Sequence, residues 1–237
     1  MLAILATIGS GSIASAEVAA PNCPKAFQGF HLGGNIGYGV GDGKQKAFAG
    51  VEDGVGSATS NNLGVRGVDG GIGVGYTHRF GNWGLGLAFD ANWANSKGRN
   101  NFGSAVDVGG NGDDDETFTS KTTAKARLKN SLQLYARAGY VIGGMSMPFV
   151  GLGWDNSSWN QRVSGNGITA SKTKRHNALL WKAGVDFLAT KHVVVGFEYT
   201  GTYAGKKSFS KHAGNLEASS SYKPQYNKFA LTAKIVY

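Results

Sequence analysis

The chain has 237 residues, including 38 glycines, 4 prolines and a single cysteine, so neither an intrachain disulfide framework nor a cysteine zinc site is possible. Its formal net charge of +9 predicts an anionic partner, but the chain has no zinc-finger spacing and no recognition-helix pattern, which argues against nucleic acid. Mean hydropathy is −0.21, and no apolar run of about 18 residues follows the N-terminal segment, which excludes a transmembrane helix there. Strands of a membrane β-barrel are still allowed, because they need only about 9–11 residues with one apolar face.

The N-terminal segment has the features of a secretory signal. Residues 2–13 are apolar or small, and Ala14, Ser15 and Ala16 fit a small-x-small cleavage site. We therefore predict a signal peptide over residues 1–16 and a periplasmic tail over residues 17–26. A single barrel domain is predicted over residues 27–237.

From Phe27 onward, apolar and small or polar residues alternate with a period of two, which is typical of β-strands with one apolar face. Eight segments carry this pattern: residues 30–40, 70–80, 83–93, 130–142, 148–154, 179–187, 193–203 and 227–237.

The two faces of these segments differ in charge. In the third segment, for example, Leu85, Leu87 and Phe89 alternate with Ala88 and Asp90. No Asp, Glu, Lys or Arg falls on the apolar face of any segment. The opposite face carries eight charged residues: Arg79, Asp90, Arg137, Lys182, Asp186, Glu198, Lys228 and Lys234.

Two observations indicate that the apolar face points outward. The interior of an eight-stranded barrel is just wide enough for side chains, so the bulky apolar face would overfill it, whereas Gly, Ala, Thr and Asn fit. Aromatic residues also gather at the segment ends, as in the two interfacial girdles of membrane barrels. They are Phe80, Trp83, Tyr140 and Tyr237 near one rim, and Tyr38, Trp93, Trp154 and Tyr203 near the other.

The connections between segments alternate in length. Residues 81–82, 143–147 and 188–192 are short, whereas residues 41–69, 94–129, 155–178 and 204–226 are long. Short periplasmic turns and long outer loops are typical of outer-membrane barrels. The predicted fold is therefore all-β: a closed eight-stranded antiparallel transmembrane up-and-down β-barrel, with both ends in the periplasm.

Several short motifs resemble those of a known family, the opacity-type surface antigens and small outer-membrane β-barrel proteins. They are FHLGGNIGY at 30–38, ARAGY at 136–140, PFV at 148–150, GVDF at 184–187 and GFEY at 196–199. The resemblance spans roughly residues 27–237. It implies a porin-like or structural surface protein, in several cases one that contacts a host, without shared catalytic residues. The alternating end of the chain also resembles the C-terminal signal by which the barrel assembly machinery recognises such proteins.

The inward charges predict an ion-paired lumen. Four cations (Arg79, Arg137, Lys182 and Lys234) and three acids (Asp90, Asp186 and Glu198) share a narrow interior, with Lys228 nearer the outer rim. Because unpaired buried charges are costly, we expect them to pair as a plug that fixes the barrel's shape. The alternative is a gated ion path, since the inward glycines leave room for water.

Two basic runs fall in predicted outer loops. Lys172, Lys174 and Arg175 form one, and Lys206, Lys207 and Lys211 form the other. They could bind lipopolysaccharide phosphates or sulfated glycans of a host surface. The alternative is a solvated loop that only balances an anionic surface.

No catalytic, cofactor or metal site is predicted. The chain has no Gly-x-Ser-x-Gly elbow and no His-x-Ser pair on a strand. The acidic run at 113–116 partly matches a calcium repeat but occurs once, and such sites need stacked copies. We therefore expect a non-enzymatic protein of the bacterial outer membrane that contacts outer-membrane lipid and lipopolysaccharide. Its loops would serve adhesion or surface recognition, with a small porin-like channel for ions or small solutes as the alternative.

Overall fold

The structure is a computed structural model that describes residues 27–51, 57–107, 117–165, 168–213 and 216–237. The predicted signal peptide (1–16), the predicted tail (17–26) and the acidic run at 113–116 lie outside the described residues. No helix in the described part of the chain is long and apolar enough to cross a membrane.

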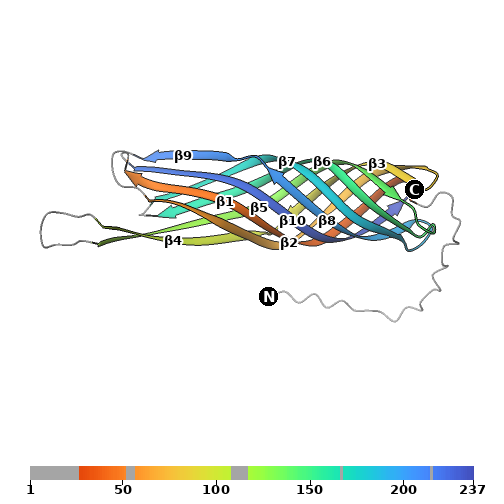
Figure 1. Cartoon of the computed structure of the whole chain (residues 1–237), viewed down its shortest axis with the longest axis horizontal. Coiled ribbons are helices and arrows are strands. Elements are labelled where there is room, and N and C mark those ends of the chain that lie inside the picture. Colours follow the sequence, from red (N-terminus) through yellow and green to blue (C-terminus); the bar gives the residue numbers. More distant parts are fainter. Residues whose placement is uncertain (1–26, 52–56, 108–116, 166–167, 214–215) are drawn as a thin grey trace, which may run out of the picture.

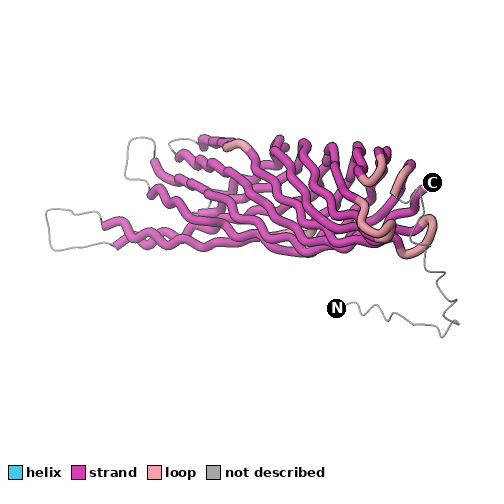
Figure 2. The backbone as a smooth tube through the Cα atoms, turned by 45° about the vertical axis from the view of Figure 1, so that its right-hand side comes forward, coloured by secondary structure: helices cyan, strands magenta, loops and turns pink. Residues whose placement is uncertain are grey.

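Strands make up nearly all of the described chain (Figure 2). Their bounds are β1 Gly29–Val51, β2 Ser57–Phe80, β3 Trp83–Ala94, β4 Lys97–Asp107, β5 Thr117–Tyr140, β6 Ser146–Gly165, β7 Ile168–Leu188, β8 Val193–Ala204, β9 Lys207–Ala213 and β10 Leu216–Val236.

Two of the strands are interrupted. β3 and β4 both pair with β5 and are separated only by residues 95–96, so they are two halves of one strand. β8 and β9 both pair with β10 and are separated by residues 205–206. The ten named strands therefore form the eight strands of the barrel wall, which we call staves: β1, β2, β3 with β4, β5, β6, β7, β8 with β9, and β10.

The sheet closes on itself. Each stave pairs antiparallel with its neighbours in chain order, and the first and last strands also pair, so Tyr38 of β1 lies between Val68 of β2 and Phe229 of β10. Closure leaves no edge strand with unpaired backbone groups. Figure 1 shows the resulting elongated barrel. The prediction of a closed eight-stranded antiparallel barrel is confirmed.

The outer connections differ from the prediction. Residues 41–69, 94–129, 155–178 and 204–226, expected as loops, are mostly strand, because the staves extend into long paired arms (Figure 1). Beyond the membrane the outer face of an arm meets water instead of lipid and becomes polar, so the apolar alternation ends there while the backbone ladder continues. The arms contain Ser- and Thr-rich stretches such as TFTSKTT, whose Thr residues favour extended backbone. The missing alternation therefore marked the end of the apolar band rather than the end of the strands.

The short connections lie at the opposite end, where the chain also ends at Tyr237 (Figure 1). The segment predicted to run to Ile142 ends as a strand at Tyr140, and Ile142 forms an isolated bridge with Ser146 inside the turn. Positive φ angles at Gly81, Gly143 and Gly144 allow these tight reversals.

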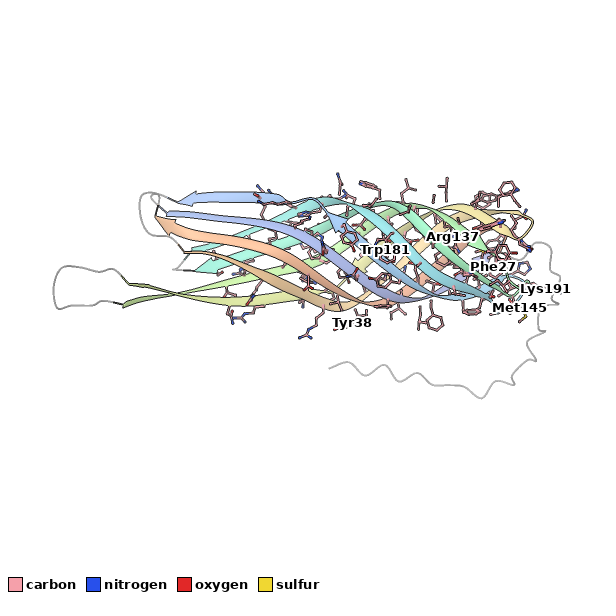
Figure 3. The ribbon with its side chains drawn as sticks, viewed as in Figure 1. Phe27, Tyr38, Arg137, Met145, Trp181 and Lys191 are labelled. Atoms are coloured by element: carbon pink, nitrogen blue, oxygen red, sulfur yellow. The ribbon has the colours of Figure 1, made fainter. Side chains whose placement is uncertain are left out.

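Alternating exposure shows which face points outward. On β3, Leu87 is 63% exposed and its neighbour Ala88 is 3% exposed. The same holds around the barrel, where the apolar rows of every stave lie outside and side chains project from the wall (Figure 3). An exposed apolar band of this extent is expected only for a surface that faces lipid. Both aromatic groups also lie outside, with Trp83 packed edge-on against Tyr140 at 5.2 Å between ring centroids.

Replacement of Leu87 by Arg tests this orientation. Leu87 lies between the two aromatic girdles, so Leu87→Arg should lower the free energy of unfolding by about 2–4 kcal/mol in lipid vesicles. A urea titration followed by tryptophan fluorescence measures the change. Gln225→Arg, an exposed position on the outer arm of β10, is the control and should stay within about 0.5 kcal/mol of the wild type. Equal stability of Leu87→Arg and wild type would contradict the orientation.

Candidate functional site

The inward positions of the staves bring charged side chains together at the centre of the barrel. Each lies on the side of its strand opposite the exposed apolar row, so the period of two alone directs it into the lumen. Buried charged residues in this region are Asp69, Asp90, Arg137, Asp155, Lys182, Asp186, Glu198 and Lys228.

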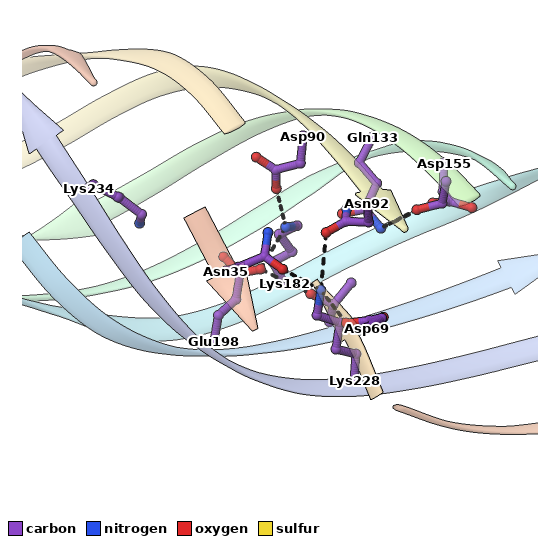
Figure 4. Close-up of polar contacts among 12 residues, drawn as sticks. Asn35, Asp69, Asp90, Asn92, Gln133, Asp155, Lys182, Glu198, Lys228 and Lys234 are labelled. Atoms are coloured by element: carbon purple, nitrogen blue, oxygen red, sulfur yellow. Dashed lines mark hydrogen bonds and ion pairs between the residues drawn. The ribbon is translucent and has the colours of Figure 1, made fainter. Parts of the chain in front are cut away.

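Lys182 of β7 occupies the middle of the lumen. Its Nζ lies 2.7 Å from Oδ2 of Asp90 on β3 and 2.6 Å from Oε1 of Glu198 on β8 (Figure 4). The Thr200 hydroxyl also donates to that Glu198 oxygen at 3.1 Å, and the ammonium lies 4.3 Å from the ring centroid of Tyr135. One cation therefore joins staves from opposite parts of the sheet.

A second group lies toward the short-turn end. Arg137 of β5 forms an ion pair with Asp186 of β7 at 2.5 Å, and Nζ of Lys234 on β10 lies 2.9 Å from the other Asp186 oxygen. The Arg137 guanidinium stacks 4.0 Å from the ring centroid of Phe149. In Figure 3 Arg137 lies inside the outline of the barrel, toward its short-turn end. Asp186 thus binds two cations from different staves.

A third group lies toward the outer arms. Nζ of Lys228 on β10 lies 2.7 Å from Oδ1 of Asp69 and donates to Asn35 at 2.7 Å and Asn92 at 3.1 Å (Figure 4). Lys228, expected nearer the rim, is therefore buried and paired. Its ammonium therefore makes one ion pair and two hydrogen bonds inside the lumen.

Two acids of the lumen were missed by the sequence reasoning. Asp69 and Asp155 fell in segments expected to be loops, yet Asp69 pairs with Lys228, and Gln133 donates to Asp155 at 3.1 Å. Both continue the period of two on the inward face, since each lies two residues from an inward glycine. Extending that period past the end of the apolar alternation would have found them.

Arg79 lies apart from these groups. Its Nε and Nη2 donate to the carbonyl oxygen of Gly81, at 3.2 and 3.0 Å, in the short turn that follows β2. The prediction placed it in the shared lumen network, and the contacts described here place it at the turn instead. Arg79 is the last inward position before the turn, where a long side chain reaches backbone carbonyls more readily than the distant acids.

Apolar clusters fill the lumen on both sides of the charges. At the short-turn end the cluster consists of Phe27, Val141, Met147, Leu188, Val194 and Val236. Toward the arms it consists of Val65, Ala126, Leu128, Trp159 and Tyr226. The Tyr226 ring crosses so close to β1 that a side chain on Gly39 would overlap the phenol oxygen. Cavities of about 20, 20 and 10 Å³ lie between these groups, each with room for about one water.

Five of the six predicted basic residues lie on strand arms rather than in loops. Lys172, Lys174 and Arg175 belong to β7, Lys206 lies in the break between β8 and β9, and Lys207 and Lys211 belong to β9. Lys174 Nζ donates to the Ser208 carbonyl at 2.5 Å, and Arg175 donates to the Asn156 amide oxygen at 3.0 Å. Two of the six therefore contribute to holding neighbouring arms together. Lys172 and Lys206 are exposed.

Within the described ranges, no group of three or more His, Cys, Asp or Glu side chains is arranged to hold a metal ion.

Removal of the central cation should destabilise the barrel. Lys182→Met leaves the Asp90 and Glu198 carboxylates buried without a counter-charge, which should cost about 3–5 kcal/mol of unfolding free energy in lipid vesicles. The triple variant Lys182→Met/Asp90→Asn/Glu198→Gln removes both orphaned charges and should recover at least half of the loss. Lys223→Met, at an exposed position, is the control. A triple variant less stable than Lys182→Met would show that the pairing does not account for the cost.

Comparison with known proteins agrees with this architecture. No curated protein sequence matches the chain. Among solved structures it is similar to the outer membrane protein OprG of Pseudomonas aeruginosa, with a TM-score of 0.50 and 13% identity, covering 89% of this chain and 97% of that one. It is also similar to Neisserial surface protein A, with a TM-score of 0.43 and 13% identity over 89% and 98% of the two chains. The outer membrane protease OmpT of Escherichia coli has a TM-score of 0.46 and 11% identity over 87% and 97%.

The likeness to OprG, at this identity, shows the fold alone. The family of outer membrane protein beta-barrel domains matches residues 3–224, which include most of the barrel. The chain therefore belongs to the outer membrane protein beta-barrel domain family and is a small β-barrel of the bacterial outer membrane.

Proposed function

We propose that this protein is a non-conducting, non-enzymatic anchor whose barrel holds paired strand arms above the outer surface for recognition. The observation that carries the proposal is the filled lumen: three ion-paired groups lie between two apolar clusters. An ion crossing the barrel would have to displace both clusters and separate the Lys182 bridges. Each of these steps exposes buried charge or apolar surface at a cost of several kcal/mol.

The charge of the lumen also supports an anchor. Among the described lumen residues, four cations (Arg137, Lys182, Lys228 and Lys234) are interspersed with five acids (Asp69, Asp90, Asp155, Asp186 and Glu198). A selective pore presents a ring of one sign to the passing ion. Here each cation is held by an acid of a different stave, which fixes the cross-section of the barrel.

The arms provide the surface available for recognition. They extend the paired backbone well beyond the exposed apolar band, as on β6 and β7, where pairing continues to Gly165 opposite Ile168. A paired arm is more rigid than a free loop, and binding residues on a rigid scaffold lose less entropy on contact. Exposed cations such as Lys172 and Lys206 suit anionic partners, including lipopolysaccharide and sulfated glycans of a host surface.

The last strand suits a role in insertion. Phe229, Leu231, Ile235 and Tyr237 form an exposed outward row on or just after β10. The barrel assembly machinery is the partner proposed for this row.

Planar-bilayer recording tests the anchor against the alternative of a small porin-like channel. The purified wild type should give no steady conductance steps, because the lumen is filled. Arg137→Gln/Glu198→Gln should be equally silent, since both apolar clusters still fill the lumen on either side of the substituted residues. Stable steps from the wild type, with a size or ion selectivity changed in the double variant, would establish the channel and refute the anchor.

A further inference from the structure

Six cations lie together on the outside of the barrel, on neighbouring arms. They are Arg66 on β2, Lys97 and Arg99 on β4, Lys125 and Arg127 on β5, and Arg162 on β6. All six are exposed. None belongs to the basic runs found from the sequence, because the six are scattered along nearly a hundred positions of the chain and converge only through strand pairing.

The strand register aligns these cations in two rows. In the first row Lys97 is directly opposite both Arg66 and Arg127. In the second row Lys125 is directly opposite both Arg99 and Arg162. Residues directly opposite in antiparallel strands have Cβ atoms about 4.5–5.5 Å apart, and like charges in such pairs are destabilising. The sheet therefore places like charges opposite one another at four pairs in one patch.

A bulge in β5 produces this arrangement. The pairing of β5 with β6 shifts between Leu128 and Asn130. The outward residues of β5 are therefore odd-numbered before the shift, on the arm, and even-numbered after it, in the apolar band. Leu128 and Ala126 consequently face the lumen, and Lys125 and Arg127 face outward. Without the shift both cations would point into the apolar end of the lumen. Bulges that re-aim side chains in this way are typically functional features.

No acid whose side chain the structure describes balances the patch. Two of its four arginines donate to neutral amides: Arg99 to Asn101 at 3.2 Å and Arg127 to Asn95 at 3.3 Å. Of the six acids whose side chains the structure describes, only Asp42 is exposed, and the other five point into the lumen. The amide contacts orient the guanidinium groups without neutralising them.

The patch begins just above the level at which the apolar band ends. Arg66 lies two residues beyond Val68, which is 56% exposed, and Lys97 lies four residues beyond Trp93, which is 57% exposed. At about 3.3 Å per residue, the first row is within roughly 7–13 Å of the last apolar side chains along the strands. Because strands in such barrels tilt by about 35–45°, this corresponds to roughly 5–10 Å along the membrane normal, which overlaps the headgroup layer of about 5–8 Å in each leaflet.

We propose that this six-cation patch binds the phosphates of an outer-leaflet glycolipid, the lipid A portion of lipopolysaccharide. Its phosphates would neutralise the aligned cations, and guanidinium and ammonium groups suit phosphate oxygens. The acyl chains would lie against the apolar band directly below. The proposal does not depend on whether the lumen conducts, so it stands or falls separately from the anchor function.

The test uses the full chain refolded into phosphatidylcholine nanodiscs with dansyl-labelled bisphosphorylated lipid A. Energy transfer from the barrel tryptophans, followed against the mole fraction of lipid A, gives the half-saturation point. Lys97→Gln/Lys125→Gln removes the central cation of each row and should raise half-saturation about thirtyfold. Lys191→Gln/Lys223→Gln removes equal charge at exposed positions outside the patch and should stay within about twofold of the wild type.

Two further measurements distinguish specific binding from other causes. Dephosphorylated lipid A should compete at least about tenfold less well than the phosphorylated form. Without lipid A, the urea midpoint of Lys97→Gln/Lys125→Gln should equal or exceed that of the wild type, because four opposed like-charge pairs are gone. This shows that lost binding is not lost folding.

Three results would overturn the proposal. The first is a half-saturation point of Lys97→Gln/Lys125→Gln that equals that of the wild type. The second is dephosphorylated lipid A that competes as well as the phosphorylated form. The third is a soluble sulfated oligosaccharide that competes as well as lipid A, which would assign the patch to a soluble polyanion instead.

Discussion

Pairing of β1 with β10 is the contact on which the rest of the structure depends. Hydrocarbon offers no hydrogen-bond partner to a backbone amide or carbonyl, so a sheet in lipid must close. The register from His31 opposite Val236 to Val51 opposite Leu216 closes it along the whole length of both strands. Closure also divides the residues of each stave into an outer and an inner set. The apolar exterior and the charged lumen are two consequences of the same ring.

The lumen then has to satisfy polar groups in a space that holds little water. Buried ion pairs are weak evidence for stability, because desolvation can exceed the attraction between the charges. Their distribution here points to a different role. Lys182 joins β7 to β3 and to its neighbour β8, and Asp186 joins β7 to β5 and β10, so three of these four bridges link staves that are not adjacent around the ring. Apolar side chains alone would fill the space without favouring one cross-section, whereas directional pairs specify which stave faces which.

The alternation of side chains made the closed barrel and its orientation predictable, because the period of two and the aromatic girdles are local features of the sequence. It also placed Arg137, Lys182, Asp186 and Glu198 in one lumen, although their pairing partners depended on register. The arms were not predictable in this way, since their outer face meets water instead of lipid and loses the apolar signal while the backbone ladder persists. Asp69 and Asp155 were missed for that reason. Arg79 was placed in the lumen only because it occupies an inward position in the alternation. The alternation does not reveal that the Gly81 carbonyl of the next turn is within reach.

The bulge at Leu128 shows where sequence reasoning ends. A single shift in register reverses the facing of every residue beyond it, and no residue type in that stretch signals the reversal. The six cations of the patch are ordinary, scattered Lys and Arg in the sequence, and they become a surface only after the bulge and the pairing of β2, β4, β5 and β6 are known. Like charges directly opposite one another reduce the stability of a sheet. A barrel that instead aligns them at the headgroup level, with no described acid beside them, carries a cost that an anionic ligand would offset. Closure of the sheet sets the register of the strands, and the ion pairs of the lumen fix which staves face one another. The spacing of the six outer cations follows from that same register.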